Sequence, residues 1–353
     1  MKILYFTPYY PPQSEAAATR AFWFVKTLEE AGHKVEVISQ KELFFNLSSN
    51  KSSALKRLFC EILMGIELFI KLLLKKNYDR YVLSSPPFFT VYIGCLALRL
   101  KGMQYLLDIR DLYPEVFFEM GLIKENSLVG KLAKKLASGW YQATHHVITV
   151  TEGLRAEIKK YGIPQEKIEL ARNGYDSELF KPGKEKFEKF TLVFHGTLGK
   201  AQNIKTLLSL AKVLEDESDI EIIVAGDGPK AAEIVSAQRG NIRYLGNLSY
   251  QEIPKLLQKC HVGLSFRTDD KIGREAFPVK VFEYIGCELP IILSPKCEAG
   301  EMIEKDELGW QFGNEQIKEM KNKIISIKKE TPNLSSSSYY TRQEQSKKIL
   351  ALI

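Results

Sequence analysis

The chain has 353 residues, 45% of them hydrophobic and 26% charged, which excludes a disordered protein and is enough for two domains with a core each. Its formal net charge of +7 suits an anionic substrate or a lipid headgroup surface. We expect no nucleic-acid partner, because no basic run is interleaved with aromatic residues.

The cysteines and the N-terminus both indicate a cytoplasmic protein. The five cysteines are far apart, with no Cys-x-x-Cys pair and no histidine at metal-ligand spacing, so we expect reduced thiols and no metal site. The opening MKILYFTPYYPP is too short an apolar run for a signal peptide.

In the first half of the chain, short apolar segments alternate with helical ones. KILYFTPYY is followed by TRAFWFVKTLEEAGHKVEVISQ, which gives strand, loop, helix, strand, and the period recurs at YDRYVLSSP, MQYLLDIRD and HHVITVTEGL. Strands that alternate with helices predict a parallel sheet covered on both faces.

The stretch from Leu55 to Lys76, LKRLFCEILMGIELFIKLLLKK, is strongly apolar. It does not fit a membrane span, because Glu61, Glu67 and Lys71 would be expensive inside a bilayer. It is either a core helix of the first domain or a helix lying in the bilayer interface, and one face could do each job.

A second series of strands follows a lapse in apolar periodicity at KPGKEKFEKF. It opens with TLVFHGTLG near Thr191 and continues through IEIIVAGDGP, IRYLGNL, HVGLSF and PIILSP. We therefore predict an α/β fold with two Rossmann-like, doubly wound domains facing across a cleft, at 1–180 and 190–334. The segment 339–353 has helical composition and can pack back onto the first domain.

Ligands of such domains bind at the carboxyl ends of the strands, so the loops there are the candidate sites. After the first strand, the small residues Ala16 to Ala18 either let a ligand approach backbone N–H groups or form a tight turn. After the strand MQYLLDI of the first domain, the charged residues Asp108, Arg110 and Asp111 either pair with one another or hold a substrate.

In the second domain, the loop FHGTLGKAQN supplies Gly196, Thr197 and Lys200 after a strand. With Arg267 and Lys280, Lys200 makes three cations that could meet a diphosphate without a metal. Two simpler interpretations stay open: AGDGP is a structural turn at Gly226, and Lys280 forms only a helix pair with Glu283. Of the five histidines, His195 is the best candidate, because it ends a strand beside Gly196.

REAFPVKVFEYIGCELPII places seven residues between Glu275 and Glu283, around a proline. Pro278 fits the first turn of a helix, so Glu275 is predicted in the preceding loop and Glu283 about one and a half turns into the helix. The two carboxylates would bracket a helix N-terminus, where anions are favoured. A diphosphate flanked by two polyols suits this arrangement.

This segment resembles the Glu, seven residues, Glu motif of retaining glycosyltransferases with the GT-B fold (family 4, glycosyl transferases group 1). PYYPPQSEAAATRAFWFVKTLEEAGHKVEVIS, RNGYDSELFKP, FHGTLGKAQNIKTLLSLAK, IVAGDGP and IRYLGNLSYQEIPKLLQKCHVGLSF follow in family order, so the resemblance covers about Met1 to Pro295. DIRDLYPEVF and PVKVFEYIG are most similar to the bacterial surface-polysaccharide branch, including the fucosamine transferases.

The resemblance implies transfer of a sugar, an N-acetylhexosamine or a related one, from a UDP-sugar to a lipid-linked or polysaccharide acceptor with retention. It implies no cofactor and no metal, and a peripheral place on the inner face of the cell membrane. The implied reaction residues are Glu275, Asp111, Arg110 and Lys280. The implied donor contacts are Ala17, Gly196, Thr197, Lys200, Gly226, Leu248, Arg267, Ala276, Phe277, Pro278, Val279, Lys280 and Glu283, with Glu283 on the ribose and Glu275 on the sugar.

The chain departs from the family pattern at several of these positions. Glu15, Ala16 and Ala17 replace a Gly-Gly, Thr197 and Gln202 replace an arginine and a lysine, and Arg110 replaces a histidine before Asp111. The diphosphate then depends more on Arg267 and Lys280. Two other functions stay open: a nucleotide-sugar epimerase on the same fold, and a nucleotide-sugar-binding subunit without turnover.

Overall fold

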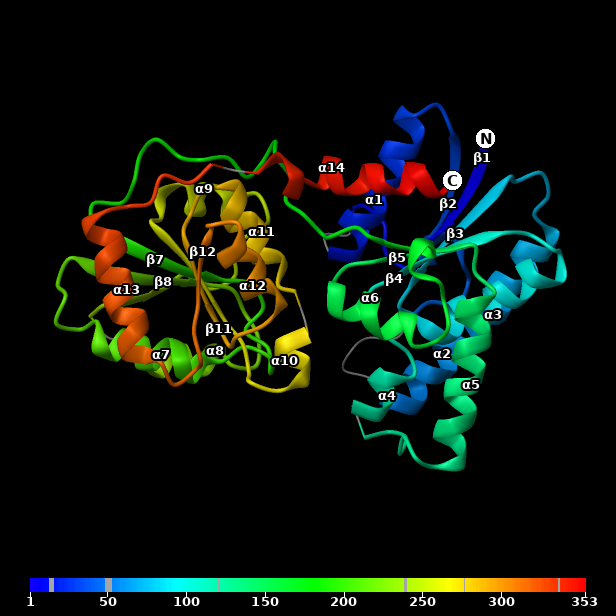
Figure 1. Cartoon of the computed structure of the whole chain (residues 1–353), viewed down its shortest axis with the longest axis horizontal. Helices are drawn as coiled ribbons and strands as arrows, with labels where there is room; N and C mark the ends of the chain where they lie inside the picture. The colour runs from blue at the N-terminus through cyan, green and yellow to red at the C-terminus, as the bar shows by residue number, and fades with distance from the viewer. Residues whose placement is uncertain (13–15, 48–52, 120, 238–239, 276, 336) are drawn as a thin grey trace. The chain divides into compact units, whose positions relative to one another are not determined.

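The computed structural model describes residues 1–12, 16–47, 53–119, 121–237, 240–275, 277–335 and 337–353, and it divides into two compact units (Figure 1). Unit 1 comprises Met1–Arg172 and Gln345–Ile353, and unit 2 comprises Asn173–Glu344. The chain leaves unit 1 at Arg172 rather than near 180, because Tyr175 and Phe180 are buried in the core of unit 2. Of the C-terminal tail, only 345–353 belongs to unit 1.

Unit 1 contains a six-stranded parallel sheet with the strand order β2-β1-β3-β4-β5-β6. The strands are β1 (Lys2–Phe6), β2 (Lys34–Ile38), β3 (Arg80–Ser85), β4 (Tyr105–Ile109), β5 (His146–Thr149) and β6 (Ile168–Leu170). The helices are α1 (Ala16–Glu30), α2 (Ala54–Leu74), α3 (Phe88–Leu100), α4 (Glu115–Glu119), α5 (Leu128–Gln142), α6 (Glu152–Lys159) and α14 (Arg342–Lys347), which runs from unit 2 into unit 1. Short 3-10 helices follow at 40–42, 165–167 and 348–352.

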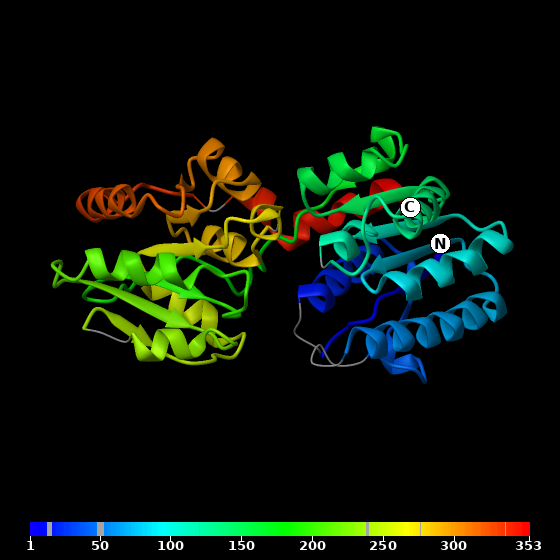
Figure 2. The ribbon, with the colours of Figure 1, turned by 90° about the horizontal axis from the view of Figure 1, so that it is seen from below.

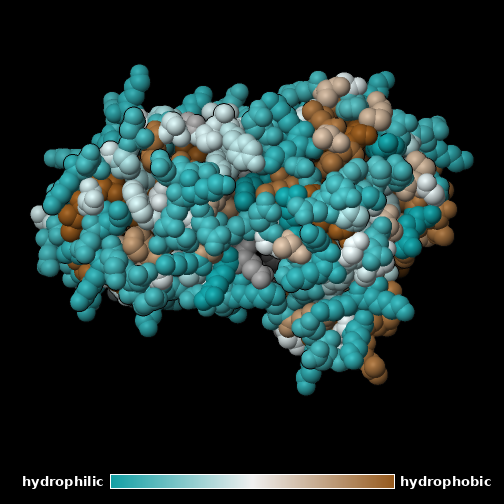
Figure 3. Space-filling view, viewed as in Figure 1, coloured by the Kyte–Doolittle hydropathy of each residue, from teal (hydrophilic) through white to brown (hydrophobic). Residues whose placement is uncertain are grey.

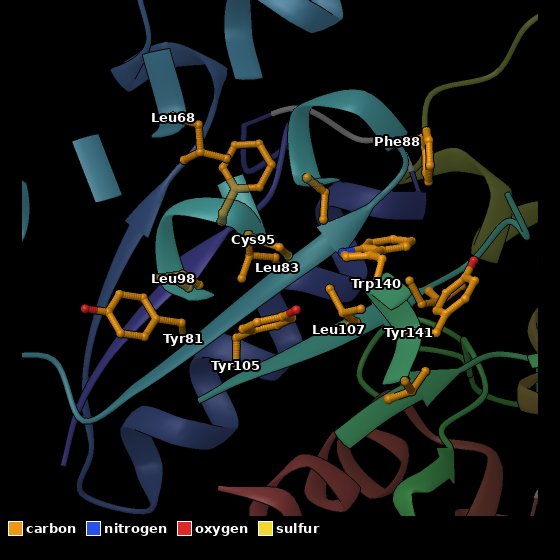
Figure 4. Close-up of a cluster of buried hydrophobic side chains, with 14 of the residues drawn as sticks. Leu68, Tyr81, Leu83, Phe88, Cys95, Leu98, Tyr105, Leu107, Trp140 and Tyr141 are labelled. Atoms are coloured by element: carbon orange, nitrogen blue, oxygen red, sulfur yellow. The ribbon is translucent and has the colours of Figure 1, made fainter. Parts of the chain in front are cut away.

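Successive residues of a strand point to opposite faces of the sheet, and in unit 1 both faces are buried. Leu4, Phe6 and Leu83 pack into one core cluster with α2, α3 and α5, part of which Figure 4 shows. Ile3 and Tyr5 pack into another with α1 and the tail residues Ile349 and Leu352. The continuous apolar strands thus form a sheet with helices on both faces (Figure 2).

Helix α2 is apolar on two opposite faces. Met64, Leu68 and Leu72 recur at helical spacing and are buried in the core cluster. On the opposite side, large apolar residues are exposed along the whole helix, namely Leu55, Phe59, Ile66, Ile70, Leu73 and Leu74. The core-helix interpretation is therefore correct for one face, while the other faces solvent. None of the described helices is long and apolar enough to cross a bilayer.

Unit 2 contains a second six-stranded parallel sheet, with the order β12-β11-β10-β7-β8-β9. Its strands are β7 (Phe190–His195), β8 (Ile220–Ala225), β9 (Ile242–Tyr244), β10 (Val262–Phe266), β11 (Ile291–Ser294) and β12 (Gly309–Gln311). Its helices are α7 (Ile204–Val213), α8 (Ala231–Ser236), α9 (Glu252–Lys259), α10 (Lys271–Glu275), α11 (Val279–Gly286), α12 (Glu298–Lys305) and α13 (Ile317–Lys329), with a 3-10 helix at 338–340. The predicted fold of two doubly wound α/β units is confirmed.

Helix α11 lies close to the centre of the second sheet because of its tyrosine. The Tyr284 ring occupies the space beside Gly263 of β10, where a Cβ would come within 2.4 Å of the ring. Its hydroxyl lies 2.9 Å from the Leu264 carbonyl oxygen and 3.1 Å from that of Val193. These contacts fix α11 against β10 and β7, whose carboxyl ends carry the candidate site.

Candidate functional site

The loop after β7 starts at Gly196, a position whose backbone conformation favours glycine. Gly196 has φ +105°, and a Cβ there would lie 3.6 Å from Lys280 Cε. Gly226 at the end of β8 has φ +143°, and its Cβ would come within 2.0 Å of the Gly196 carbonyl oxygen. The close approach of these two strand ends places Gly196 directly beside Lys280 of α11. AGDGP is thus a structural turn, and it also shapes this loop.

Lys280 is buried, with 7% of its surface exposed. Its Nζ donates a hydrogen bond to Gln202 Oε1 at 3.3 Å and lies 4.0 Å from the centroid of the Phe194 ring. The pKa of Lys280 is lowered to about 7, because burial and the nearby Arg267 lower it more than Glu283 raises it. The amine has Gln202 and not a carboxylate at hydrogen-bond distance, so an anionic ligand would stabilise its charged form.

Glu283 lies one turn further along α11 and is also buried, with 6% exposed. Burial raises the pKa of Glu283 to about 7, although Arg342 and Lys280 lower it. Its Oε2 lies 3.4 Å from His195 Nε2, and burial lowers the pKa of that histidine to about 3, so the ring is neutral. The simple helix pair between Lys280 and Glu283 is not what the structure shows, because each side chain contacts other groups.

Arg267 follows β10 and is half-buried beside the same loop. Its Nε donates to the Gly273 carbonyl oxygen at 3.1 Å, and its backbone forms an antiparallel bridge with Gln202. Burial lowers the pKa of Arg267, and this guanidinium is the main charge acting on Lys280. The structure thus brings Arg267 and Lys280 together around Gln202.

Two of the predicted loop residues, Thr197 and Lys200, are exposed on the same loop. Their side chains are accessible to a ligand. A lysine that the sequence analysis missed supports the loop: Lys230 Nζ donates to the carbonyl oxygens of Gln202 at 2.6 Å and Lys200 at 3.2 Å. Lys230 directly follows the AGDGP turn, and no sequence motif at this position indicates a functional lysine.

The segment before α11 differs in part from the expectation. Glu275 is the last residue of α10 and not a loop residue, and Pro278 is the N-cap of α11, directly before its first residue, Val279. Phe277 stacks on Phe282 with ring centroids 4.8 Å apart. Ala276, and the side chain of Glu275, lie outside the described residues. Leu248 packs at the edge of the core cluster that contains α11.

In unit 1 the buried ion pair joins Arg20 and Asp108, not Arg110 and an aspartate. Arg20 donates to Asp108 at 2.9 Å and to the Ala171 carbonyl oxygen at 2.7 Å, and Ser84 Oγ donates to the same aspartate at 3.0 Å. The partner of Asp108 is therefore on α1, far away in sequence. This pair is a structural link between α1, β4 and the end of unit 1.

Arg110 and Asp111 stay accessible at the end of β4. Arg110 donates to the Pro86 carbonyl oxygen at 3.3 Å, and Asp111 is exposed at the surface. Desolvation by surrounding protein raises the pKa of the Asp111 carboxyl, and Glu119 raises it while Arg110 lowers it. Ala17 is buried in the first turn of α1, which allows close backbone packing there.

In chemical terms, unit 2 offers a ligand two cations, a helix N-terminus and a buried carboxylate at one end of its sheet. Lys280 and Arg267 match phosphate oxygens, and a carboxylate such as Glu283 accepts hydrogen bonds from a diol. Within the described ranges, no group of three or more histidine, cysteine or acidic side chains could hold a metal ion.

Two family models match adjoining parts of the chain. Glycosyltransferase Family 4 matches residues 17–179, and Glycosyl transferases group 1 matches residues 176–344. Together with the two Rossmann-like units, these matches decide the family. The chain is a GT-B glycosyltransferase.

The glycosyltransferase is similar to curated proteins of bacterial origin. It is 23% identical to the probable glycosyltransferase WbjE of Pseudomonas aeruginosa over 79% of this chain and 74% of that protein. It is also 23% identical to WcaI of Escherichia coli K12, a putative colanic acid biosynthesis glycosyl transferase, over 74% of this chain and 76% of that protein.

Solved structures share the fold of this glycosyltransferase. Anabaena HepE in complex with UDP superposes with a TM-score of 0.63 at 15% identity, over 99% of this chain and 95% of that one. The UDP-GlcNAc 2-epimerase of Methanocaldococcus jannaschii superposes with a TM-score of 0.63 at 14% identity, over 100% of this chain and 99% of that one. Likeness of fold alone therefore does not separate transfer from epimerisation.

Proposed function

We propose that the enzyme transfers a sugar from a UDP-sugar to a lipid-linked or polysaccharide acceptor, with retained anomeric configuration, in the synthesis of a bacterial surface polysaccharide. The observation that carries this proposal is the burial of two ionisable side chains, Lys280 and Glu283, on α11 beside the Gly196 loop. Buried charges without full partners are costly and are typical of ligand sites. The polysaccharide role is supported by the name of WcaI, and UDP as the nucleotide by the UDP complex of HepE.

In this proposal the donor is bound by unit 2. Glu283 accepts hydrogen bonds from the ribose hydroxyls, while Arg267, Lys280 and the exposed Lys200 neutralise the diphosphate. Glu275 holds the sugar hydroxyls, and the backbone N–H of Phe277 contacts the sugar or phosphate. Because these cations supply the positive charge, no metal and no cofactor are required.

The reaction then needs no protein nucleophile. The leaving phosphate oxygen takes the proton of the acceptor hydroxyl on the face that it leaves, as an oxocarbenium-like centre forms. Arg267 and Lys280 stabilise the charge that grows on the diphosphate, and Arg110 and Asp111 of unit 1 position the acceptor. The bond to the donor oxygen breaks and the bond to the acceptor oxygen forms on the same side of the sugar.

A panel of nucleotide-sugars tests the donor proposal. A ligand that binds the folded state raises its midpoint of thermal unfolding, so the correct UDP-sugar should give the largest increase. Glu283→Gln should remove that increase, and the exposed Glu252→Gln on α9 should keep it. A UDP-sugar that is converted to its epimer without any acceptor would instead support the epimerase.

We also propose that the enzyme is peripheral on the inner face of the cell membrane, through the exposed face of α2. Glu67 accepts hydrogen bonds from the backbone N–H groups of Phe44 and Phe45, and this places two further exposed aromatic rings beside α2. Such a stripe is more apolar than a helix facing water normally is. An interfacial location would bury it.

Two of the lysines at α2 are less available for headgroups than the apolar residues, while Lys56 and Lys76 at its ends are exposed. Lys71 forms an ion pair with Glu67 at 3.3 Å, and Lys75 forms one with Glu36. Ile66→Ser with Ile70→Ser is therefore the sharper test, and it should weaken binding to vesicles about tenfold. Val235→Ser, which changes an exposed residue of α8 in unit 2, is the control. Unchanged vesicle binding would leave α2 as a core helix only.

A further inference from the structure

Helix α5 carries an exposed apolar stripe that unit 1 does not cover. Leu128 is 87% exposed, Val129 62%, Leu132 57% and Leu136 49%. Leu128, Leu132 and Leu136 follow at intervals of four residues, so they lie one above another on one side of the helix. The side facing the core carries Ala137, Trp140 and Tyr141 instead. We call the exposed side, with Lys131 and Lys135, the α5 face.

The charge on the α5 face has one sign. α5 contains three lysines and no acidic residue in LVGKLAKKLASGWYQ. Lys134 pairs with Glu125, which precedes the helix. Lys131 and Lys135 are exposed one turn apart, next to the leucines. A row of leucines flanked by exposed lysines is the pattern of a helix that lies at an anionic bilayer surface.

A second copy of the chain is a poorer partner for this face. If two copies packed their α5 faces against each other, Lys131 and Lys135 of one copy would approach the same lysines of the other, and like charges would repel. An anionic lipid surface can bind both the leucines and the lysines of the α5 face. The leucines enter the acyl boundary while the lysine ammonium groups reach the headgroup phosphates.

The α5 face lies on the same side of the unit 1 sheet as α2. Leu68 of α2 and Trp140 of α5 belong to one core cluster, which covers the sheet face formed by Leu4, Leu83 and Leu107 (Figure 4). Apolar side chains also appear at the surface of unit 1 in the space-filling view of Figure 3. Two helices anchored to one rigid core can contact a single membrane surface together. Their contributions to the binding constant then multiply.

We propose that the α5 face is a second, charge-selective membrane contact of this enzyme, whose partner is an anionic phospholipid headgroup surface. The proposal rests on the proposed membrane-associated function and adds a contact that α2 does not supply. On α2, Lys71 and Lys75 near the exposed apolar residues are paired and the exposed Lys56 and Lys76 lie at its two ends, whereas on α5 Lys131 and Lys135 are exposed among the leucines. The preference for anionic lipid should therefore depend on α5.

The experiment measures binding of the full chain to vesicles of phosphatidylcholine alone and of phosphatidylcholine with phosphatidylglycerol, by sedimentation at low and high salt. Lys131→Glu with Lys135→Glu should lower affinity for the anionic vesicles by at least about tenfold and remove the salt dependence. Leu132→Ser with Leu136→Ser should lower affinity by about tenfold for both vesicles. Lys205→Glu with Lys212→Glu, two exposed lysines of α7 in unit 2, is the charge-matched control and should bind as wild type.

Three results would overturn the inference. Wild-type binding by both α5 variants would exclude the contact, and equal wild-type binding to both vesicles would exclude selection by charge. A dimer in solution that the leucine variant turns into a monomer would show that a second copy covers the face. UDP binding, measured by calorimetry on the same proteins, separates the two proposals: its absence in wild type contradicts the donor site and leaves the α5 inference standing, and its retention in the α5 variants shows that they are folded.

Discussion

Replacing Lys280 by methionine should make the protein more stable and at the same time remove donor binding. The amine is buried, and lowering its pKa from 10.5 to about 7 corresponds to at most about 5 kcal/mol of charge burial. Methionine keeps the apolar stem beside Phe194 and removes the charge. It also loses the hydrogen bond to Gln202 and the contact with the ring, so we expect a net gain of about 1–3 kcal/mol at pH 7.

The pH dependence of this gain has a defined sign. The pKa of Lys280 is lowered in the folded state, so the unfolded chain binds more protons between about pH 7 and pH 10.5. The free energy of unfolding of the wild type therefore rises as pH rises through this window. Lys280→Met has no amine at this position and lacks this rise. The difference in unfolding free energy between the two proteins should shrink by about 2 kcal/mol from pH 7 to pH 9.

Urea unfolding followed by circular dichroism measures this difference, and calorimetry measures UDP binding. Loss of a charge-assisted contact to the diphosphate should weaken UDP binding by at least about tenfold. Lys212→Met, which changes an exposed lysine of α7, should alter neither stability nor affinity by much. A less stable Lys280→Met protein that binds UDP normally, with a stability difference independent of pH, would refute the reasoning.

Three other predictions concern the glutamate, the glycine turn and the buried ion pair. Glu283→Gln should stabilise the protein near pH 7, because its raised pKa costs stability as pH rises from about 4.5 to 7, and should weaken UDP binding; equal affinity in calorimetry would exclude a ribose contact. Gly226→Ala should lower the free energy of unfolding by about 1–3 kcal/mol, since its Cβ meets the Gly196 carbonyl oxygen, whereas Gly240→Ala has open space; equal urea midpoints would contradict this. Arg20→Leu should cost about 3–5 kcal/mol by leaving Asp108 buried and unpaired, and adding Asp108→Leu should restore part of that loss; no recovery would show that the ion pair itself is needed.

The sequence pattern predicts the central strands and two of the four edge strands, β2 and β9. Five apolar runs in each half correspond to the strands found there, since strands buried on both faces are continuous apolar segments. β6 and β12 were not predicted, and each has three residues at the edge of its sheet. A short strand with partly exposed residues has no distinctive pattern.

In the candidate site, the sequence predicts which residues share a sheet end but not which distant residues their side chains contact. The order of strands and loops predicts that Gly196, Arg267 and Lys280 share one sheet end, and the structure places them there. Spacing alone suggested a Lys280 and Glu283 pair and an Arg110 ion pair. The partners are instead Gln202 for Lys280 and Arg20 for Asp108, which depend on how loops and helices pack.

The most direct test of the central claim follows the anomeric proton of the sugar by nuclear magnetic resonance during turnover. The enzyme is incubated with the UDP-sugar selected by thermal stabilisation, with and without a lipid-linked glycan acceptor. We predict that UDP is released only with acceptor, that the product keeps the anomeric configuration of the donor, and that Lys280→Met abolishes both signals. An inverted product, or an epimerised donor without acceptor, would contradict the account.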